Sequence, residues 1–361
     1  MPEVPPVAFV RGGQGWLGVG AGTRVEVPSR DAFARAGRWW ARHVRAQRRA
    51  GHDGPLVAFG AFPFDRRSPA GGVLIAPDRV ERIDGGLPVL GRAPRPTATV
   101  RDGAMSRDAY VEAVRRVRAE ILAGHLEKAV LARDVLICPE SPLDLGAVLD
   151  ALAAAHPAAS VFSVDGLIGA SPETLVTVHD GVVTARVLAG TAGPGEAEAL
   201  AGSDKDRREH EIAVRSVVDA LRSHVVGLET SPEPFVLELP HLTHLATDFR
   251  AEIADGSDVL ALVAALHPTA AVAGTPSRKA LDTIRQLEPL DRGRYAGPVG
   301  WVDADGDGEW AIALRSAQLG ADGTLRAFAG AGIVADSVPE IELAETELKL
   351  RPILEALRAR A

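Results

Sequence analysis

The chain has 361 residues, of which 46% are hydrophobic and 24% are charged, so it can bury the core of one large domain or two small ones. This balance excludes a disordered or fibrous chain, and the single cysteine, Cys138, excludes a disulfide framework and a cysteine-rich metal site. The formal net charge of −8 argues against general binding to nucleic acid or to an anionic membrane, so an anionic substrate would have to be bound by local lysines, arginines or a metal.

The first ten residues contain Glu3 and three prolines where a secretory signal peptide needs an apolar run. The sequence also contains no uninterrupted apolar run long enough to span a bilayer. We therefore expect a cytoplasmic protein that does not bind a membrane.

Residues 1–105 are weakly patterned, and we assign them to an N-terminal part of the fold. Glycines and prolines divide this region into short elements. We expect strands at 7–10, 16–20 and 23–27, an arginine-rich helix over 30–50, a strand within 55–64 and a connector at 91–103.

Gly13, Gly15 and Gly18 have the G-x-G-x-x-G spacing of a dinucleotide-binding turn. That motif needs a strand before it and a helix after it, whereas strand-like residues 16–20 and 23–27 follow here. We therefore predict a glycine-rich hairpin.

Five arginines of the helix expected over 30–50 recur at helical spacing. They could attract an anionic partner, but such a stripe is more often a solvated helix face, and we predict the latter for Arg35, Arg38, Arg42, Arg45 and Arg49.

From Ser106 onward, helices alternate with long strands, and we assign residues 106–361 to the catalytic region. Ser106 and Ser203 each precede a segment with apolar residues at helical spacing, which predicts two N-capped helices. We expect strands at 128–137, within 159–190, within 297–319 and at 324–334, and a final helix from about Pro339 to the end of the chain. Long strands with turn signals and helices inserted between them favour an α+β fold with large antiparallel sheets.

Two further patterns imitate metal sites. Residues 303–308 (DADGDG) resemble the start of a calcium loop, but the twelfth position, which needs a glutamate, is Leu314, so we predict a polar turn between two strands. His241 and His244 lie in a strand-like segment, where a spacing of three places side chains on opposite faces and argues against a metal pair.

Two predicted helices carry acids on one face. Asp206 and Glu209 are separated by three residues, and Glu342, Glu345 and Lys349 follow the same helical face. Carboxylates from two helices, with few other ligand types, suit a hard cation such as Mg²⁺. Acid pairs on ordinary surface helices are the alternative.

Lys128 begins an apolar strand, and Glu173 lies in a turn within GASPETL. A lysine in a dry site can lose its proton and act as a base, and a glutamate in an apolar turn can keep its proton and act as an acid. Taken alone, either residue is more often an ordinary surface charge.

Together these segments resemble the chorismate-utilising enzymes: isochorismate synthase, salicylate synthase, and the synthase components for anthranilate and aminodeoxychorismate. The resemblance covers about residues 106–355, in the order of the family. It rests on KAVLAR, GASPETL, LAGT, SDKDRREHE, LHPTAAVAGTP, LEPLDRGRYAGPVGW, GEWAIALRSA, AGAGIV and the ExxET pattern at 342–346.

The resemblance implies a single large chorismate-binding domain like anthranilate synthase component I, in which two large antiparallel sheets enclose the site and helices lie outside. It implies Glu209 and Glu345 as direct Mg²⁺ ligands, with Asp206 and Glu342 acting directly or through water. It implies that the remaining positions bind chorismate: Thr191, Ala271, Val272, Tyr295, Arg315, Gly330, Gly332 and Lys349. Tyr295 and Arg315 match the pair for the enolpyruvyl carboxylate, with help from backbone N–H groups around Gly330 and Gly332.

Within this family the residues indicate water as the nucleophile. Lys128 matches the lysine that activates water in isochorismate and salicylate synthases, with Glu173 as the acid, and Ala189 stands where aminodeoxychorismate synthases carry a nucleophilic lysine. Small Ala271 and apolar Val272 resemble the isochorismate synthases. We therefore expect a Mg²⁺-dependent isomerase that converts chorismate reversibly to isochorismate, for menaquinone or siderophore synthesis.

Salicylate synthase, which goes on to eliminate pyruvate, is the alternative enzyme, and a non-catalytic binding protein on the same fold is the alternative class. Retention of Lys128, Glu173 and the acidic helices argues against the binding protein. The chain has no amidotransferase segment, so we expect no amidotransferase subunit and a monomer.

Overall fold

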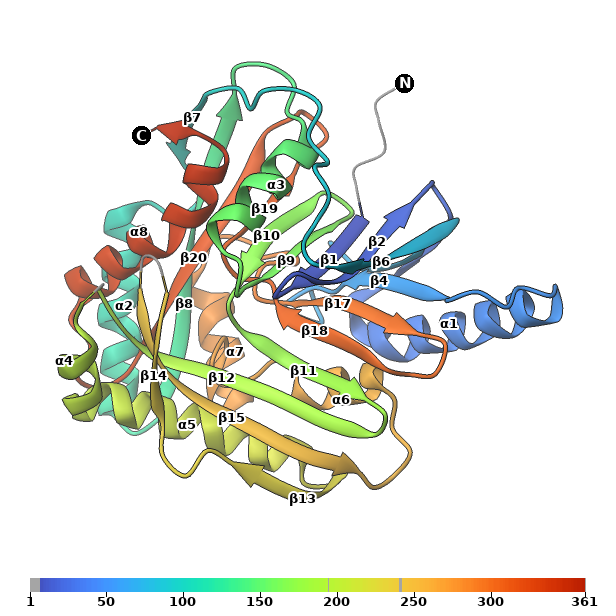
Figure 1. The fold of residues 1–361 in the computed structure, drawn as a ribbon. Coiled ribbons are helices and arrows are strands. Elements are labelled where there is room, and N and C mark those ends of the chain that lie inside the picture. The colour runs from blue at the N-terminus through green and yellow to red at the C-terminus, as the bar shows by residue number, and fades with distance from the viewer. Residues whose placement is uncertain (1–6, 194, 240–241, 361) are drawn as a thin grey trace.

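The computed structural model describes residues 7–193, 195–239 and 242–360, which form two large sheets with helices outside them (Figure 1). Among these residues the larger sheet has eleven strands, in the order β21-β7-β8-β20-β19-β10-β9-β1-β2-β6 with β16 beside β8. Its strands are β1 (Val7–Arg11), β2 (Gln14–Val19), β6 (Arg79–Asp84), β7 (Ala98–Asp102), β8 (Lys128–Pro139), β9 (Ser160–Val164), β10 (Leu167–Ser171), β16 (Gly274–Thr275), β19 (Ser316–Leu319), β20 (Leu325–Ile333) and β21 (Ala359–Arg360).

The smaller sheet has ten strands within the described ranges, in the order β13-β15-β12-β11-β18-β17-β4-β5-β3 with β14 beside β15. They are β3 (Thr23–Val27), β4 (Val57–Ala61), β5 (Gly72–Ala76), β11 (Thr174–His179), β12 (Val182–Ala192), β13 (Val225–Thr230), β14 (Phe235–Glu238), β15 (Thr243–Ile253), β17 (Pro298–Asp303) and β18 (Gly308–Ile312). Neighbouring strands pair antiparallel in both sheets, whereas β21 and β7 pair in parallel.

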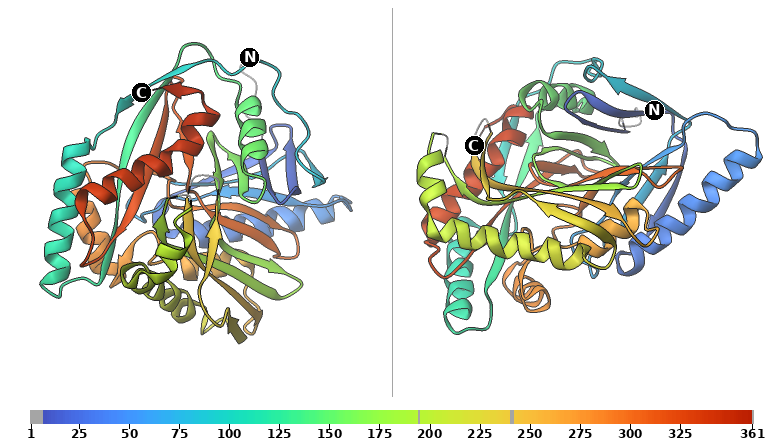
Figure 2. Two further views of the ribbon diagram at one scale, coloured as in Figure 1. Left: turned by 60° about the vertical axis from the view of Figure 1, so that its left-hand side comes forward. Right: turned by 60° about the horizontal axis from the view of Figure 1, so that its bottom comes forward.

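Helices cover the outer faces of both sheets (Figure 2). Helices α2, α3 and α8 pack on the larger sheet, α1, α5 and α6 pack on the smaller one, and α7 lies against β8. The helices are the 3-10 turn η1 (Ser29–Asp31), α1 (Ala32–Arg49), α2 (Arg107–Leu122), α3 (Leu145–Ala155), α4 (Ala197–Gly202), α5 (Asp204–Leu221), α6 (Val259–Leu266), α7 (Ser277–Leu287) and α8 (Pro339–Ala356). No helix in the described part of the chain is long and apolar enough to cross a membrane.

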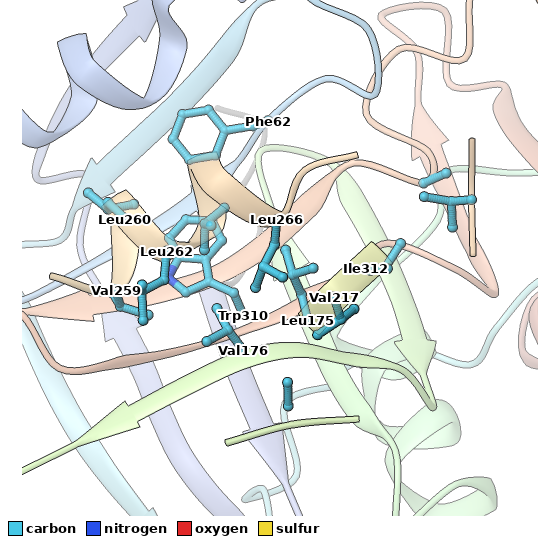
Figure 3. Packing of buried hydrophobic residues seen from close by; sticks show 14 of the residues in the cluster. Phe62, Leu175, Val176, Val217, Val259, Leu260, Leu262, Leu266, Trp310 and Ile312 are labelled. Atoms are coloured by element: carbon cyan, nitrogen blue, oxygen red, sulfur yellow. The ribbon is translucent and has the colours of Figure 1, made fainter. Parts of the chain in front are cut away.

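Apolar side chains fill each interface between these layers. Phe9, Phe59 and Phe162 are fully buried between the two sheets. On the other face of the smaller sheet, the fully buried Trp310 of β18 lies among residues of α6 and β11 (Figure 3). These layers confirm the predicted single α+β domain with two antiparallel sheets and outer helices. Residues 7–105 add strands to both sheets, and the boundary at residue 105 remains a prediction.

Several elements begin or turn at the residues that the sequence predicted. Ser106 and Ser203 cap α2 and α5 by accepting hydrogen bonds from Ala109 N and Asp206 N. Gly12 and Gly13, both with positive φ, join β1 and β2, so the G-x-G-x-x-G segment is a hairpin. Residues 304–307 likewise join β17 and β18. The five-arginine stripe of α1 is exposed.

The final helix differs from the prediction, because it ends at Ala356 and does not continue to the end of the chain. Arg358 takes a positive φ of 51°, which breaks the helix, and Ala359–Arg360 then pairs with β7.

Candidate active site

A buried ion pair joins the larger sheet to α5 at the centre of the site. The Lys128 side chain, at the first residue of β8, is fully buried, and its Nζ lies 3.0 Å from Glu209 Oε1 on α5. Burial acts to raise the pKa of Glu209, but the charge and hydrogen bond of Lys128, together with the charges of Lys349 and Lys205, lower this pKa below its usual range. The structure therefore holds a carboxylate and the predicted base against each other between the layers.

Gly332 of β20 leaves the space that this pair occupies. A Cβ at position 332 would lie 2.1 Å from Glu209 Oε1 and 2.8 Å from Lys128 Cε. Both distances are shorter than van der Waals contact, so a larger residue would displace one of the two side chains.

The carboxylates of α8 lie beside this pair. Glu342 is buried, its Oε1 accepts a hydrogen bond from Lys205 Nζ at 2.8 Å, and Glu345 Oε1 accepts one from Lys349 Nζ at 2.5 Å. Burial and the neighbouring Glu345 raise the pKa of Glu342 to about 7, and its Oε2 has no hydrogen-bond partner among the described residues. Buried carboxylates with a free oxygen are a donor set that fits Mg²⁺.

Asp206 has other partners in this structure. Its carboxylate accepts hydrogen bonds from Ser203 Oγ and, at 3.4 Å, from Thr191 N. These contacts fix the start of α5 against β12, and a metal-binding role for Asp206 remains a prediction.

Glu173 lies in the turn between β10 and β11 and is buried. Burial raises the pKa of its carboxyl group to about 7, although the charges of Lys128, Arg315 and Lys349 act to lower it. Because the carboxylate lacks enough solvation, a substantial fraction of Glu173 keeps its proton at neutral pH, as a general acid requires.

One cavity collects most of the residues predicted to bind substrate. The Tyr295 ring stacks on Phe328 with ring centroids 5.1 Å apart, and Arg315 is buried at a positive φ of 50°. Lys349 Nζ donates to Gly330 O at 3.1 Å. The residues predicted from the sequence that line this cavity are Glu173, Thr191, Glu209, Ala271, Val272, Tyr295, Arg315, Gly330, Gly332 and Lys349. Lys128 and the acids of α8 lie next to it, so their predicted roles are geometrically compatible and remain predictions.

His244 also lines this cavity, although its spacing in the sequence did not predict it. His244 is paired with Thr191 across β15 and β12; its Nδ1 lies 3.1 Å from Thr191 Oγ1, and its Nε2 lies 3.4 Å from Arg315 Nη2. Burial and the charge of Arg315 lower its pKa well below the usual value, so the ring is neutral and can orient Arg315 without repelling it. The register of two distant strands brings these residues together, and residue spacing carried no signal of it. His241, which together with His244 was predicted not to form a metal pair, lies outside the described residues.

Comparison with known proteins agrees with this arrangement. Residues 90–358 match the sequence profile of a family described as chorismate binding enzyme. The chain is 37% identical over 338 residues to the putative isochorismate synthase MenF of Mycobacterium tuberculosis (strain H37Rv), covering 87% of this chain and 90% of that protein. It is 34% identical over 265 residues to the isochorismate synthase MenF of Bacillus subtilis (strain 168), covering 70% of this chain and 56% of the length of that relative.

A solved structure shows the same likeness over almost the whole chain. The putative 2,3-dihydroxybenzoate-specific isochorismate synthase DhbC of Bacillus anthracis superposes with a TM-score of 0.87 and 32% identity. The match covers 97% of this chain and 95% of that one.

Replacement of Gly332 by alanine tests the packing around the central ion pair. Because the added methyl group displaces Glu209 or Lys128, we expect Gly332→Ala to lower enzymatic turnover by about 10²-fold, a typical cost of misplacing catalytic groups by about 1 Å. Gly202→Ala is the matched control, because a Cβ there meets no atom within 4 Å. Near-normal turnover by Gly332→Ala would show that the pair has room to move.

Proposed function

The chain belongs to the chorismate-binding enzyme family, and on this premise we propose that it is an isochorismate synthase, an isomerase that converts chorismate reversibly to isochorismate. One observation carries the proposal: a buried glutamate with a pKa of about 7 lines a cavity together with cationic side chains, and the buried Lys128 lies close enough for its charge to act on that glutamate. This combination supplies a base, an acid and binding groups for a dianion.

The chemistry adds water at C2 of the ring and removes the hydroxyl at C4. Lys128 is paired with Glu209 as a cation, so it must first release that proton; its uncharged Nζ then takes a proton from water as the water oxygen bonds to C2. The ring double bonds shift, the C4–O bond breaks, and Glu173 gives its proton to the leaving hydroxyl, which departs as water. The two residues exchange roles in the reverse direction, so the reaction is reversible.

Charged and polar side chains would hold the two carboxylates of chorismate. Arg315, oriented by His244, and the hydroxyl of Tyr295 would bind the enolpyruvyl carboxylate, and Lys349 would face the ring carboxylate. Thr191 and the backbone at Gly330 and Gly332 would complete the binding site for these carboxylates. These cations offset the substrate charge locally, although the whole chain has a net charge of −8.

Glu209, Glu342 and Glu345 would hold Mg²⁺, with Asp206 as a further ligand through water. The free Oε2 of the buried Glu342 supports this assignment, because a buried carboxylate oxygen without a partner is costly unless a cation or a proton binds it. Bound there, Mg²⁺ would stabilise negative charge on the ring carboxylate. The monomeric state, the cytoplasmic location and the absence of an amidotransferase subunit remain predictions from the sequence.

The pH dependence of turnover tests the acid. Glu173 must carry its proton, and its pKa is about 7, so kcat in the forward direction should fall as pH rises above about 7. Glu173→Gln should lower kcat by about 10²–10⁴-fold and remove this descending limb. The control is Glu309→Gln, because Glu309 is a half-buried glutamate whose pKa burial also raises, but it pairs with Arg11 and does not line the cavity. A limb that persists unchanged in Glu173→Gln would assign it to another group.

Product analysis tests the proposed function itself. Incubation with chorismate and Mg²⁺ should accumulate isochorismate, with little pyruvate or salicylate, because Ala271 and Val272 offer no hydroxyl to align the pyruvyl group for elimination. EDTA should abolish turnover. Release of pyruvate in step with chorismate loss from the first minutes would identify a salicylate synthase, and unaltered chorismate with Mg²⁺ present would identify a binding protein.

A further inference from the structure

A second buried ion pair borders the cavity and is formed by two residues of the segment that connects α7 to β17. Glu288 and Arg292 are 6% and 4% exposed, and the guanidinium binds the carboxylate through two hydrogen bonds, of 2.5 Å from Nη2 and 2.9 Å from Nε. Phe64 covers the guanidinium at 4.2 Å from its ring centroid. Burying two charges costs much solvation energy, and the hydrogen bonds that this pair makes must offset that cost.

These hydrogen bonds fill a gap along one edge of β8. β16 pairs with β8 only at Lys128 and Ala129, and β7 pairs with it only from Val135 onward. Between them, Arg292 Nη2 donates to Val130 O at 2.6 Å, and Glu288 Oε1 accepts from Ala132 N at 2.8 Å. The side-chain pair thus replaces the hydrogen bonds of a neighbouring strand. It supplies one donor and one acceptor to buried backbone groups, which would be costly to bury without a hydrogen-bond partner.

The same guanidinium also binds the other walls of the cavity. Arg292 Nη1 donates to Val272 O at 3.1 Å, and Arg292 O accepts from Tyr295 N at 3.0 Å. Val130, Val272, Arg292 and Tyr295 all line the cavity. The Arg292 side chain therefore holds β8 and the segment around Val272, and the backbone carbonyl of the same residue closes the turn that carries Tyr295.

We propose that Glu288 and Arg292 are positioning residues for Lys128, a role that rests on the proposed function. Val130 is two residues from Lys128 on β8, so both side chains point to the same face of the strand. Holding Val130 O and Ala132 N fixes this part of β8, and with it the position of Lys128 Nζ relative to Glu173. A strand that moves by about 1 Å here would cost about 10²-fold in rate without changing any group that contacts substrate charge.

The test compares two conservative replacements in full-length protein. Arg292→Lys keeps the positive charge but cannot bind Glu288, Val130 O and Val272 O together. We expect kcat to fall about 10²-fold, while KM for chorismate and the Mg²⁺ concentration for half activation stay within about threefold of wild type. Arg285→Lys is the matched control. Arg285 lies on α7 and donates two hydrogen bonds to Asp65, but it does not line the cavity. The kcat of Arg285→Lys should therefore equal that of wild type.

A double replacement shows whether Arg292 acts through Lys128. In a Lys128→Gln background, Arg292→Lys should cost less than about twofold in residual rate, because the base that it positions is already absent. In a Thr191→Val background, Arg292→Lys should lower the rate by the same factor of about 10² as it does in wild type. Equal losses in the two backgrounds would overturn the proposal, as would a raised KM with unchanged kcat.

Hydrogen exchange provides a measurement that does not depend on activity. Amide exchange at residues 130–132 should be faster in Arg292→Lys than in wild type or Arg285→Lys. If Arg292→Lys does not fold, Glu288→Gln replaces it as the test variant, because it keeps an oxygen for Ala132 N. In Glu288→Gln we expect the same fall in kcat with an unchanged KM. Normal kcat and normal amide exchange in that variant would overturn the proposal. Failure of wild type to form isochorismate would instead reject the proposed function.

Discussion

The buried contact between Lys128 and Glu209 is the constraint around which this molecule is arranged. It joins the first residue of β8 in the larger sheet to α5, which covers the smaller sheet. Two charges withdrawn from water are tolerated only when each neutralises the other and the surroundings hold them in place. Gly332 provides the space, and β8 is held by its pairing with β20 from Ala129 onward and with β16 at Lys128. The layers therefore form a rigid frame around a few polar groups.

The environment gives the carboxyl groups of the site different tasks. Glu209 faces a lysine and has a lowered pKa, whereas Glu173, in an apolar turn, and Glu342, beside Glu345, have pKa values raised to about 7. One residue type can thus serve as an anion, as a proton donor and as a carboxyl group whose proton is readily displaced by a cation. The opposing cations Arg315 and Lys349 come from other elements, so the substrate charge can be balanced inside an acidic protein.

Much of this could be predicted from the sequence, because its signals are local or belong to recognisable segments. Serine caps, glycine turns and helical spacing indicated α2, α5 and the β1–β2 hairpin, and the family resemblance indicated the residues that line the cavity. Helices α3 and α6 were missed, because their nearly uniform apolar sequences show no polar face to set a period, although Asp144 and Asp258 cap them. His244 and Arg292 were missed for another reason. Their roles depend on strand register and on a gap in a sheet edge, which are properties of the assembled fold.

In the proposed mechanism, water activated by Lys128 becomes the new hydroxyl at C2. The direct measurement is the reaction in water enriched in ¹⁸O, stopped early enough that the reverse reaction is negligible, with the position of the label in isochorismate determined by mass spectrometry. We expect one ¹⁸O atom in the C2 hydroxyl of each product molecule and the loss of this product in Lys128→Ala. Isochorismate without ¹⁸O at C2 would show that the hydroxyl comes from the substrate itself, and it would contradict the mechanism.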